Sequence, residues 1–239
     1  MKKVSFGGAI GLLLLAGGLL YLRYGSSARR SARLVAFLRA PQEHSDWVVP
    51  ARIRCGDAPF LMPTAGYIGY LWGDRFQLLH THQGVDIFGG TAPGETPVYA
   101  AYDGLLTRLP AWKSAVIIRH EDPLHPDRII WTYYAHMADP QGRSLIAPDF
   151  PPGTEDRPVQ AGTLLGYQGN YSGNPRRPVG VHLHFSIVLG DGQGRFRNEL
   201  DIANTLDPSP YLGLSLNARE VPPDRVPLCP PEDIHPFEE

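Results

Sequence analysis

The chain has 239 residues, of which 43% are hydrophobic, and a formal net charge of -2. This length can bury the core of one main domain and leaves little room for a second catalytic domain. The arginines are scattered and form no basic stripe with interleaved aromatic residues, which argues against a nucleic-acid partner.

The N-terminus carries a targeting signal. Lys2 and Lys3 precede an apolar stretch over residues 4–22, and Arg23 follows it. The stretch is short for a membrane-spanning helix, and its basic start and the small residues after it also fit a cleavable signal peptide. We therefore predict that residues 1–28 are a signal peptide or a membrane anchor and that the chain is exported. The arginines that follow weaken the prediction of export, because basic residues prefer the cytoplasmic side of a membrane.

The body of the chain has the pattern of a β protein. Residues 29–60 are arginine-rich, and we interpret them as a stalk or lead-in with a short helix over 31–39. Over 61–212, short apolar or alternating runs are separated by Gly, Pro, Asn and Asp, which is typical of an antiparallel sheet. We predict a mainly β fold: an antiparallel sheet or β-sandwich core with an open groove and little helix. The expected strands are 67–72, 85–88, 97–101, 104–109, 115–120, 129–136, 163–168 and 181–189.

Two insertions interrupt this rhythm, a hairpin tip at 121–128 and a proline-rich excursion at 138–158. Loops of such length are usually functional or mobile. Residues 201–211 are expected to form a helical turn that closes the domain. The proline-rich tail, 213–239, is expected to be an extended strap or a disordered segment.

Cys55 and Cys229 are the only cysteines, one ahead of the expected core and one in the tail. In an exported protein they favour a disulfide that joins the two ends of the domain. Two free thiols are the alternative. A metal site of the C-x-x-C kind is excluded by their spacing.

Two histidines, His182 and His184, lie one residue apart in the run VHLHF. Residues i and i+2 of a strand point to the same face, so both imidazoles are expected to enter one pocket. There, one imidazole can bind a metal and the other can transfer protons. Two half-buried strand residues with hydrogen-bond partners are the alternative.

A histidine and a carboxylate, His82 and Asp86, frame the earlier segment HQGVD. Gly84 and the glycines at 89–90 favour a bent strand entrance over a helix, with both side chains turned inward. Together with a later histidine, this segment offers three protein ligands and leaves a fourth tetrahedral position for water, the arrangement of catalytic zinc. For the segment alone, an exposed turn is the alternative.

A further histidine, His136, ends the β-prone run 129–136. With His136 added to HQGVD and VHLHF, the sequence resembles the lysostaphin-type, or LytM-like, zinc endopeptidases, which cut peptide cross-bridges in bacterial cell walls. The resemblance runs from about residue 63 to 188. The matching motifs, in chain order, are GYI (66–68), WGDR (72–75), HQGVD (82–86), PVYAA (97–101), DG (103–104), VIIRH (116–120), YAH (134–136), VQAG (159–162), LG (165–166) and HLHF (182–185).

The resemblance implies a role for each of five residues. His82, Asp86 and His184 resemble the family's zinc ligands, which implies one zinc ion per chain. His136 and His182 resemble its two catalytic histidines that do not bind zinc. None of the five is substituted, so the non-hydrolytic members of the family are a poorer fit.

The chemistry of such a site is that of a hydrolase. Zinc held by two neutral imidazoles and one carboxylate keeps a positive charge, so it can lower the pKa of bound water from about 15.7 toward about 7 and polarise the scissile carbonyl. No H-E-x-x-H motif supplies a glutamate base, so a histidine takes that role. We assign His182 as the general base, and His136 as the residue that stabilises the oxyanion or protonates the leaving amine. The sequence leaves open which does which.

The leading hypothesis is an exported zinc endopeptidase that cleaves peptidoglycan cross-links in the periplasm or cell wall. It is either secreted or held at the membrane by an uncleaved N-terminal segment. A wall-binding or regulatory LytM-like module that activates another hydrolase is the alternative.

The segment NPRRP (174–178) and the insertions depart from the family pattern and bear on which bond is cut. Two further histidines have weaker expected roles: His80 could mimic a fourth ligand, and His120 could support the site. The oligomeric state is left open.

Overall fold

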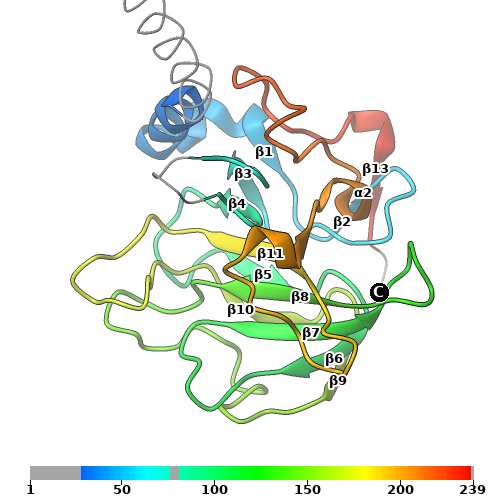
Figure 1. Cartoon of the computed structure of the whole chain (residues 1–239). Helices are drawn as coiled ribbons and strands as arrows, with labels where there is room; N and C mark the ends of the chain where they lie inside the picture. Colours follow the sequence, from blue (N-terminus) through cyan, green and yellow to red (C-terminus); the bar gives the residue numbers. More distant parts are fainter. Residues whose placement is uncertain (1–27, 76–80, 238–239) are drawn as a thin grey trace, which may run out of the picture.

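The structure of the chain, a computed structural model, describes residues 28–75 and 81–237. The expected signal or anchor segment lies outside these residues, apart from its last position. One antiparallel sheet dominates the described part, in the order β1-β3-β4-β11-β8-β7-β6-β9, with β12 beside β11 (Figure 1). Its strands are β1 (Val48–Val49), β3 (Gly66–Tyr70), β4 (Val85–Phe88), β6 (Gly104–Thr107), β7 (Val116–Glu121), β8 (Ile129–Ala135), β9 (Arg157–Val159), β11 (Leu183–Leu189) and β12 (Thr205–Leu206). The predicted mainly β, antiparallel fold is confirmed.

Two small sheets complete the fold. One pairs β5 (Pro97–Tyr99) with β10 (Leu164–Tyr167), and the other pairs β2 (Ile53–Cys55) with β13 (Ile234–Pro236). All eight expected strands are present, and their ends differ from the prediction by no more than two residues. The strands that the prediction missed, such as β1 and β12, have two or three residues and are too short to show a period of two.

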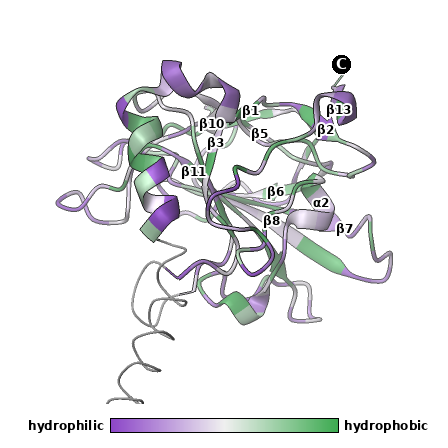
Figure 2. Cartoon of the chain, turned by 90° about the horizontal axis from the view of Figure 1, so that it is seen from above, coloured by the Kyte–Doolittle hydropathy of each residue, from purple (hydrophilic) through white to green (hydrophobic). Residues whose placement is uncertain are grey.

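The described part of the lead-in packs on the sheet. Residues 28–39 form a helix, as predicted for 31–39, and the 3-10 helix η1 (Pro41–Trp47) follows it. We call residues 28–39 the lead-in helix. Its Phe37 is fully buried, with its ring centroid 5.1 Å from that of Tyr67 on β3. Its buried residues, Arg30, Leu34 and Phe37, are spaced by about one helical turn, so the helix packs through one side. Figure 2 shows both hydrophobic and hydrophilic residues on it. The domain boundaries themselves stay a prediction.

Within residues 28–75 and 81–237, no helix combines the length and the apolar character needed to cross a membrane.

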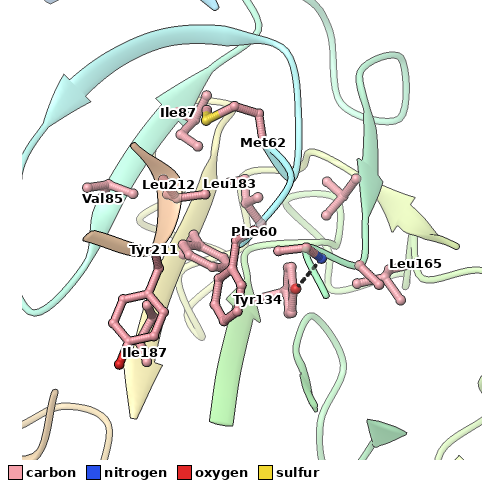
Figure 3. Close-up of a cluster of buried hydrophobic side chains, with 14 of the residues drawn as sticks. Phe60, Met62, Val85, Ile87, Tyr134, Leu165, Leu183, Ile187, Tyr211 and Leu212 are labelled. Carbon is pink, nitrogen blue, oxygen red and sulfur yellow. Dashed lines mark hydrogen bonds between the residues drawn. The ribbon is translucent and has the colours of Figure 1, made fainter. Parts of the chain in front are cut away.

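The main core is a cluster of aromatic and aliphatic side chains drawn from distant segments (Figure 3). Phe60 packs against Tyr211 of the short helix α2 (Ser209–Leu212), with 5.1 Å between the ring centroids. The hydroxyl of the fully buried Tyr134 accepts a hydrogen bond from the Ala101 N–H at 2.8 Å. This bond satisfies a polar group that would be costly to bury alone.

Alternation along the central strands separates the core from the opposite face of the sheet. On β4, Val85 and Ile87 are in the core, and Asp86 between them faces a cavity. On β11, Phe185 is in the core, and His184 faces the same cavity. Because successive strand residues point to opposite faces, one sheet both buries the apolar set and presents the polar set.

The C-terminal tail is tied to the start of the domain. Cys55 and Cys229 form a disulfide, with 5.6 Å between their Cα atoms, so the bridged alternative is correct. Beyond it, η3 (Pro231–Asp233) leads into β13, which pairs with β2. The expected helical turn over 201–211 is present as η2 (Ile202–Asn204) and α2. The tail is therefore an extended strap as far as residue 237.

Candidate metal centre

The structure brings His82, Asp86 and His184 together. Asp86 on β4 and His184 on β11 are cross-strand partners, and His82 lies just ahead of β4. The Nε2 atom of His82 lies 3.0 Å from Asp86 Oδ1 and 3.1 Å from His184 Nδ1. The His184 Nδ1 and Asp86 Oδ1 atoms are 2.9 Å apart. All three side chains are buried, and together they form a group that could hold a metal ion.

The donor set fits zinc. Two nitrogens and one oxygen are ligand types that zinc prefers, and bonds of about 2.0–2.2 Å at tetrahedral angles separate such donors by about 3.3–3.6 Å. The three observed separations are slightly shorter. The backbone carbonyl of Leu71 lies 3.0 Å from His82 Nδ1 and can only accept, so Nδ1 carries the proton of the neutral ring. The lone pair of Nε2 then faces the other two donor atoms.

Burial and mutual attraction shift the pKa values of these groups. Burial alone raises the pKa of Asp86, but the neighbouring histidines, His82 foremost, outweigh it and hold this pKa well below its usual range. Burial lowers the pKa of His184. Burial also acts to lower the pKa of His82, but the charge and hydrogen bond of Asp86 outweigh it, and the pKa is raised. The ionised carboxylate and the neutral His184 ring are the forms that bind a metal.

The two remaining predicted histidines, His136 and His182, lie beside this group. Their ring centroids are 4.5 Å apart, and His182 Nε2 is 3.6 Å from Asp86 Oδ1. Burial lowers the pKa of His182 to about 4, so its ring is neutral at neutral pH. His136 follows β8 with a φ of 72°, a left-handed conformation uncommon for a residue other than glycine. Such backbone strain is often found at functional sites.

The loop from Tyr171 to Gly180 fixes the orientation of both of these rings. The Nδ1 of His136 donates to the Tyr171 carbonyl at 2.8 Å, and the Nδ1 of His182 donates to the Gly180 carbonyl at 2.7 Å. Whenever either ring is neutral, its Nε2 therefore carries the lone pair. The segment NPRRP (174–178), which departs from the family pattern, lies in this loop. Gly142 of the 138–158 insertion lies close to the Tyr171 ring. Two of the chain's unusual segments are thus connected to the loop that contacts His136 and His182, although neither lines the cavity.

All five predicted residues line one cavity of about 500 Å³. Its walls also include Tyr70, Phe88, Glu199 and Leu200, which the sequence analysis did not single out. Phe88 could have been found by the period of two, because it lies two residues after Asp86 on β4. The loop residues Glu199 and Leu200 carry no such signal.

Other residues considered from sequence lie elsewhere. His120 is buried away from the cavity, with Nδ1 2.7 Å from the Asp103 carbonyl and Nε2 2.7 Å from the Thr132 hydroxyl. Burial lowers its pKa to about 4, so it is a neutral packing residue. Of the two adjacent tyrosines on β8, Tyr133 lines the cavity, whereas Tyr134 points into the core. His80 lies outside the described residues.

Gly84 lets β4 and β11 approach closely at the site. A Cβ atom at this position would lie 2.3 Å from the Phe185 carbonyl oxygen, 2.9 Å from Ser186 Cβ and 3.0 Å from His184 Cε1. The first contact is with backbone, so no side-chain rotation relieves it. The role of this glycine is therefore close packing between two ligand-bearing strands.

We expect Gly84→Ala to lower the free energy of unfolding by about 1–3 kcal/mol, the usual range for overpacking, and to weaken zinc binding. Chemical denaturation and chelator competition measure the two effects. Gly173→Ala is the control, because that glycine has a φ of 87° but no atom near its would-be Cβ. It should lose stability through backbone strain and keep its zinc affinity. Unchanged zinc affinity in Gly84→Ala would contradict the close-packing role.

Comparisons find solved structures that are similar to the chain. No protein-family model and no curated protein matches it. A Ruminococcus gnavus protein assigned as a glycyl-glycine endopeptidase, lytM, is 28% identical, with a TM-score of 0.36, over 55% of this chain and 45% of that chain. Helicobacter pylori Csd3 is 19% identical, with a TM-score of 0.37, over 66% and 33% of the two chains. A variant catalytic domain of the prophage-encoded M23 protein EnpA from Enterococcus faecalis is 23% identical, with a TM-score of 0.37, over 63% and 94%.

The chain spans less than half the length of the first two of these chains. The predicted resemblance to LytM-like proteins is confirmed: one of these neighbours is assigned as lytM and another is described as an M23 protein.

Proposed function

We propose that the protein is an exported zinc-dependent endopeptidase that cleaves peptide cross-links of bacterial peptidoglycan. One observation carries the proposal: two imidazoles and a carboxylate converge within 3.1 Å of one another, in a cavity that holds two further histidines. One of the similar structures is assigned as a glycyl-glycine endopeptidase, which supports a peptide as the substrate.

Each residue has a distinct role in the proposal. His82, Asp86 and His184 hold the metal. When bound, zinc supplies Lewis-acid chemistry, lowering the pKa of water and polarising a carbonyl. His182 is neutral, with its Nε2 lone pair toward the donor group, so it can accept a proton from the attacking water. His136 is half-buried and lines the same cavity; in its protonated form, with an N–H on both ring nitrogens, it stabilises the oxyanion or protonates the leaving amine.

The described lead-in does not cover this cavity. None of the described residues that line it comes from 28–60. A latent or purely regulatory protein whose metal is hidden by these residues therefore has no support in the described part of the chain. The regulatory alternative is left to experiment.

The proposal predicts metal-dependent hydrolysis. The purified full-length chain should bind about one zinc, as one three-ligand site implies, and should solubilise cell-wall sacculi. Chelation should abolish solubilisation, and added zinc should restore it. Metal content and the release of soluble muropeptides are the measurements. Full activity after complete removal of zinc would refute the zinc mechanism, and zinc binding without any hydrolysis would favour the regulatory alternative.

A further inference from the structure

A short turn of the chain, residues 71–74, holds His82 in place. The carbonyl oxygen of Leu71 accepts the hydrogen bond from His82 Nδ1 at 3.0 Å. The N–H of Gly73 donates to the His82 carbonyl, and the His82 N–H donates to the Asp74 carbonyl, both at 2.8 Å. This turn therefore fixes the backbone and the ring of one candidate ligand together.

The Asp74 carboxylate organises the turn. Its Oδ2 accepts from the Leu71 N–H at 2.8 Å, and the Asp74 N–H donates to the Leu71 carbonyl at 3.1 Å. Asp74 is only 2% exposed. A buried carboxylate needs charged or hydrogen-bonding partners, because it loses its hydration.

A cation for this carboxylate comes from the lead-in helix. The Nε of Arg30 lies 3.2 Å from Asp74 Oδ1, and its Nη2 donates to the Val221 carbonyl of the tail at 2.7 Å. Arg30 is 3% exposed. One buried guanidinium thus joins the lead-in helix, the turn and the tail, which Figure 1 shows at the same end of the molecule.

We propose that Arg30 and Asp74 are positioning residues for the metal centre. They act through Leu71, whose carbonyl keeps the proton of His82 on Nδ1 and turns Nε2 toward the other donor atoms. A ligand histidine whose second nitrogen donates to a fixed acceptor has its tautomer and orientation set before the metal binds. The inference rests on the proposed function, and it makes the lead-in helix a support of the metal site.

The test measures zinc affinity of the full-length chain by chelator competition. Asp74→Asn keeps a side-chain oxygen near the Leu71 N–H but removes the charge, and Arg30→Met removes the donors at similar length. Each should weaken zinc binding about 10–100-fold, the usual effect of losing a partner of a metal ligand. The double variant should bind no more weakly than Arg30→Met, because an asparagine needs no cation. Arg30→Lys keeps the charge without the planar fork, so it should fold and show a smaller loss.

Arg33→Met is the matched control. Arg33 lies on the same helix, but its Nη2 donates to the Asp224 carbonyl of the tail at 2.6 Å and not to the turn. Zinc affinity should be unchanged in this variant. The melting temperature of each metal-free variant separates general destabilisation from an effect at the site. Wild-type zinc affinity in Arg30→Met and Asp74→Asn, or an equal loss in Arg33→Met, would overturn the inference.

A metal-free measurement distinguishes failure of this inference from failure of the proposed function. Nitrogen-15 NMR of the imidazole groups reports which ring nitrogen of His82 carries the proton. In the wild type, Nδ1 should carry a proton, and the fraction of rings protonated on Nε2 alone should increase in Arg30→Met and Asp74→Asn, whether or not zinc binds. An unchanged His82 signal in both variants would refute the positioning role. A wild type that binds no zinc would refute the proposed function.

Discussion

Replacing His184 with alanine should abolish both zinc binding and peptidoglycan cleavage, whereas His182→Ala should keep zinc and lose turnover. The two side chains share a strand motif but have different surroundings. His184 Nδ1 is 2.9 Å from Asp86 Oδ1 and 3.1 Å from His82 Nε2, within the donor group. His182 Nε2 is further out, at 3.6 Å from the same carboxylate oxygen. Loss of a general base typically lowers kcat by about 10²–10⁴-fold.

Metal content and the rate of muropeptide release measure these two losses separately. His125→Ala is a suitable control, because His125 is exposed in the 121–128 insertion and lies outside the cavity. It should match the wild type in both measurements. If His182→Ala lost zinc as completely as His184→Ala, the division of roles would be wrong. Full activity in His184→Ala would reject the metal site itself.

Removing the disulfide should lower the free energy of unfolding by about 2–5 kcal/mol. Cys55 and Cys229 are separated by 174 residues, so their bridge closes a very long loop and restricts the unfolded chain strongly. The variant is the double substitution Cys55→Ser and Cys229→Ser. Equilibrium denaturation with urea measures the change.

Reductant provides the control for this experiment. It should destabilise the wild type by a similar amount and leave the double-serine protein unchanged. Equal stability of the wild type with and without reductant would show that the bridge does not stabilise the domain.

The local features of the site follow from the sequence. A period of two placed His182 and His184 on one face, and the structure has both lining the same cavity. Glycine at position 84 correctly indicated that His82 and Asp86 turn inward. These features depend on neighbours within a few residues, and local spacing reports them directly. The catalytic and ligand roles of the five residues stay a prediction.

Long-range partners could not be predicted in the same way. Arg30 and Asp74 are 44 residues apart, and nothing in either segment indicates that the two side chains meet. The spacing of Cys55 and Cys229 allowed a bridge or two free thiols, because a spacing does not state a distance in space. Periodicity gives the face on which a residue lies, and only the packed chain gives its partner on another element.

The strand order of the large sheet determines when the candidate centre can assemble. β4 and β8 do not pair with each other, and both pair with β11, which lies between them. β11 is also the last long strand of the sheet along the chain. A nascent chain that ends before residue 183 has no strand to join its two halves, and such non-local pairing slows folding. The candidate centre should therefore assemble late, once the chain includes the last of the candidate ligands, His184.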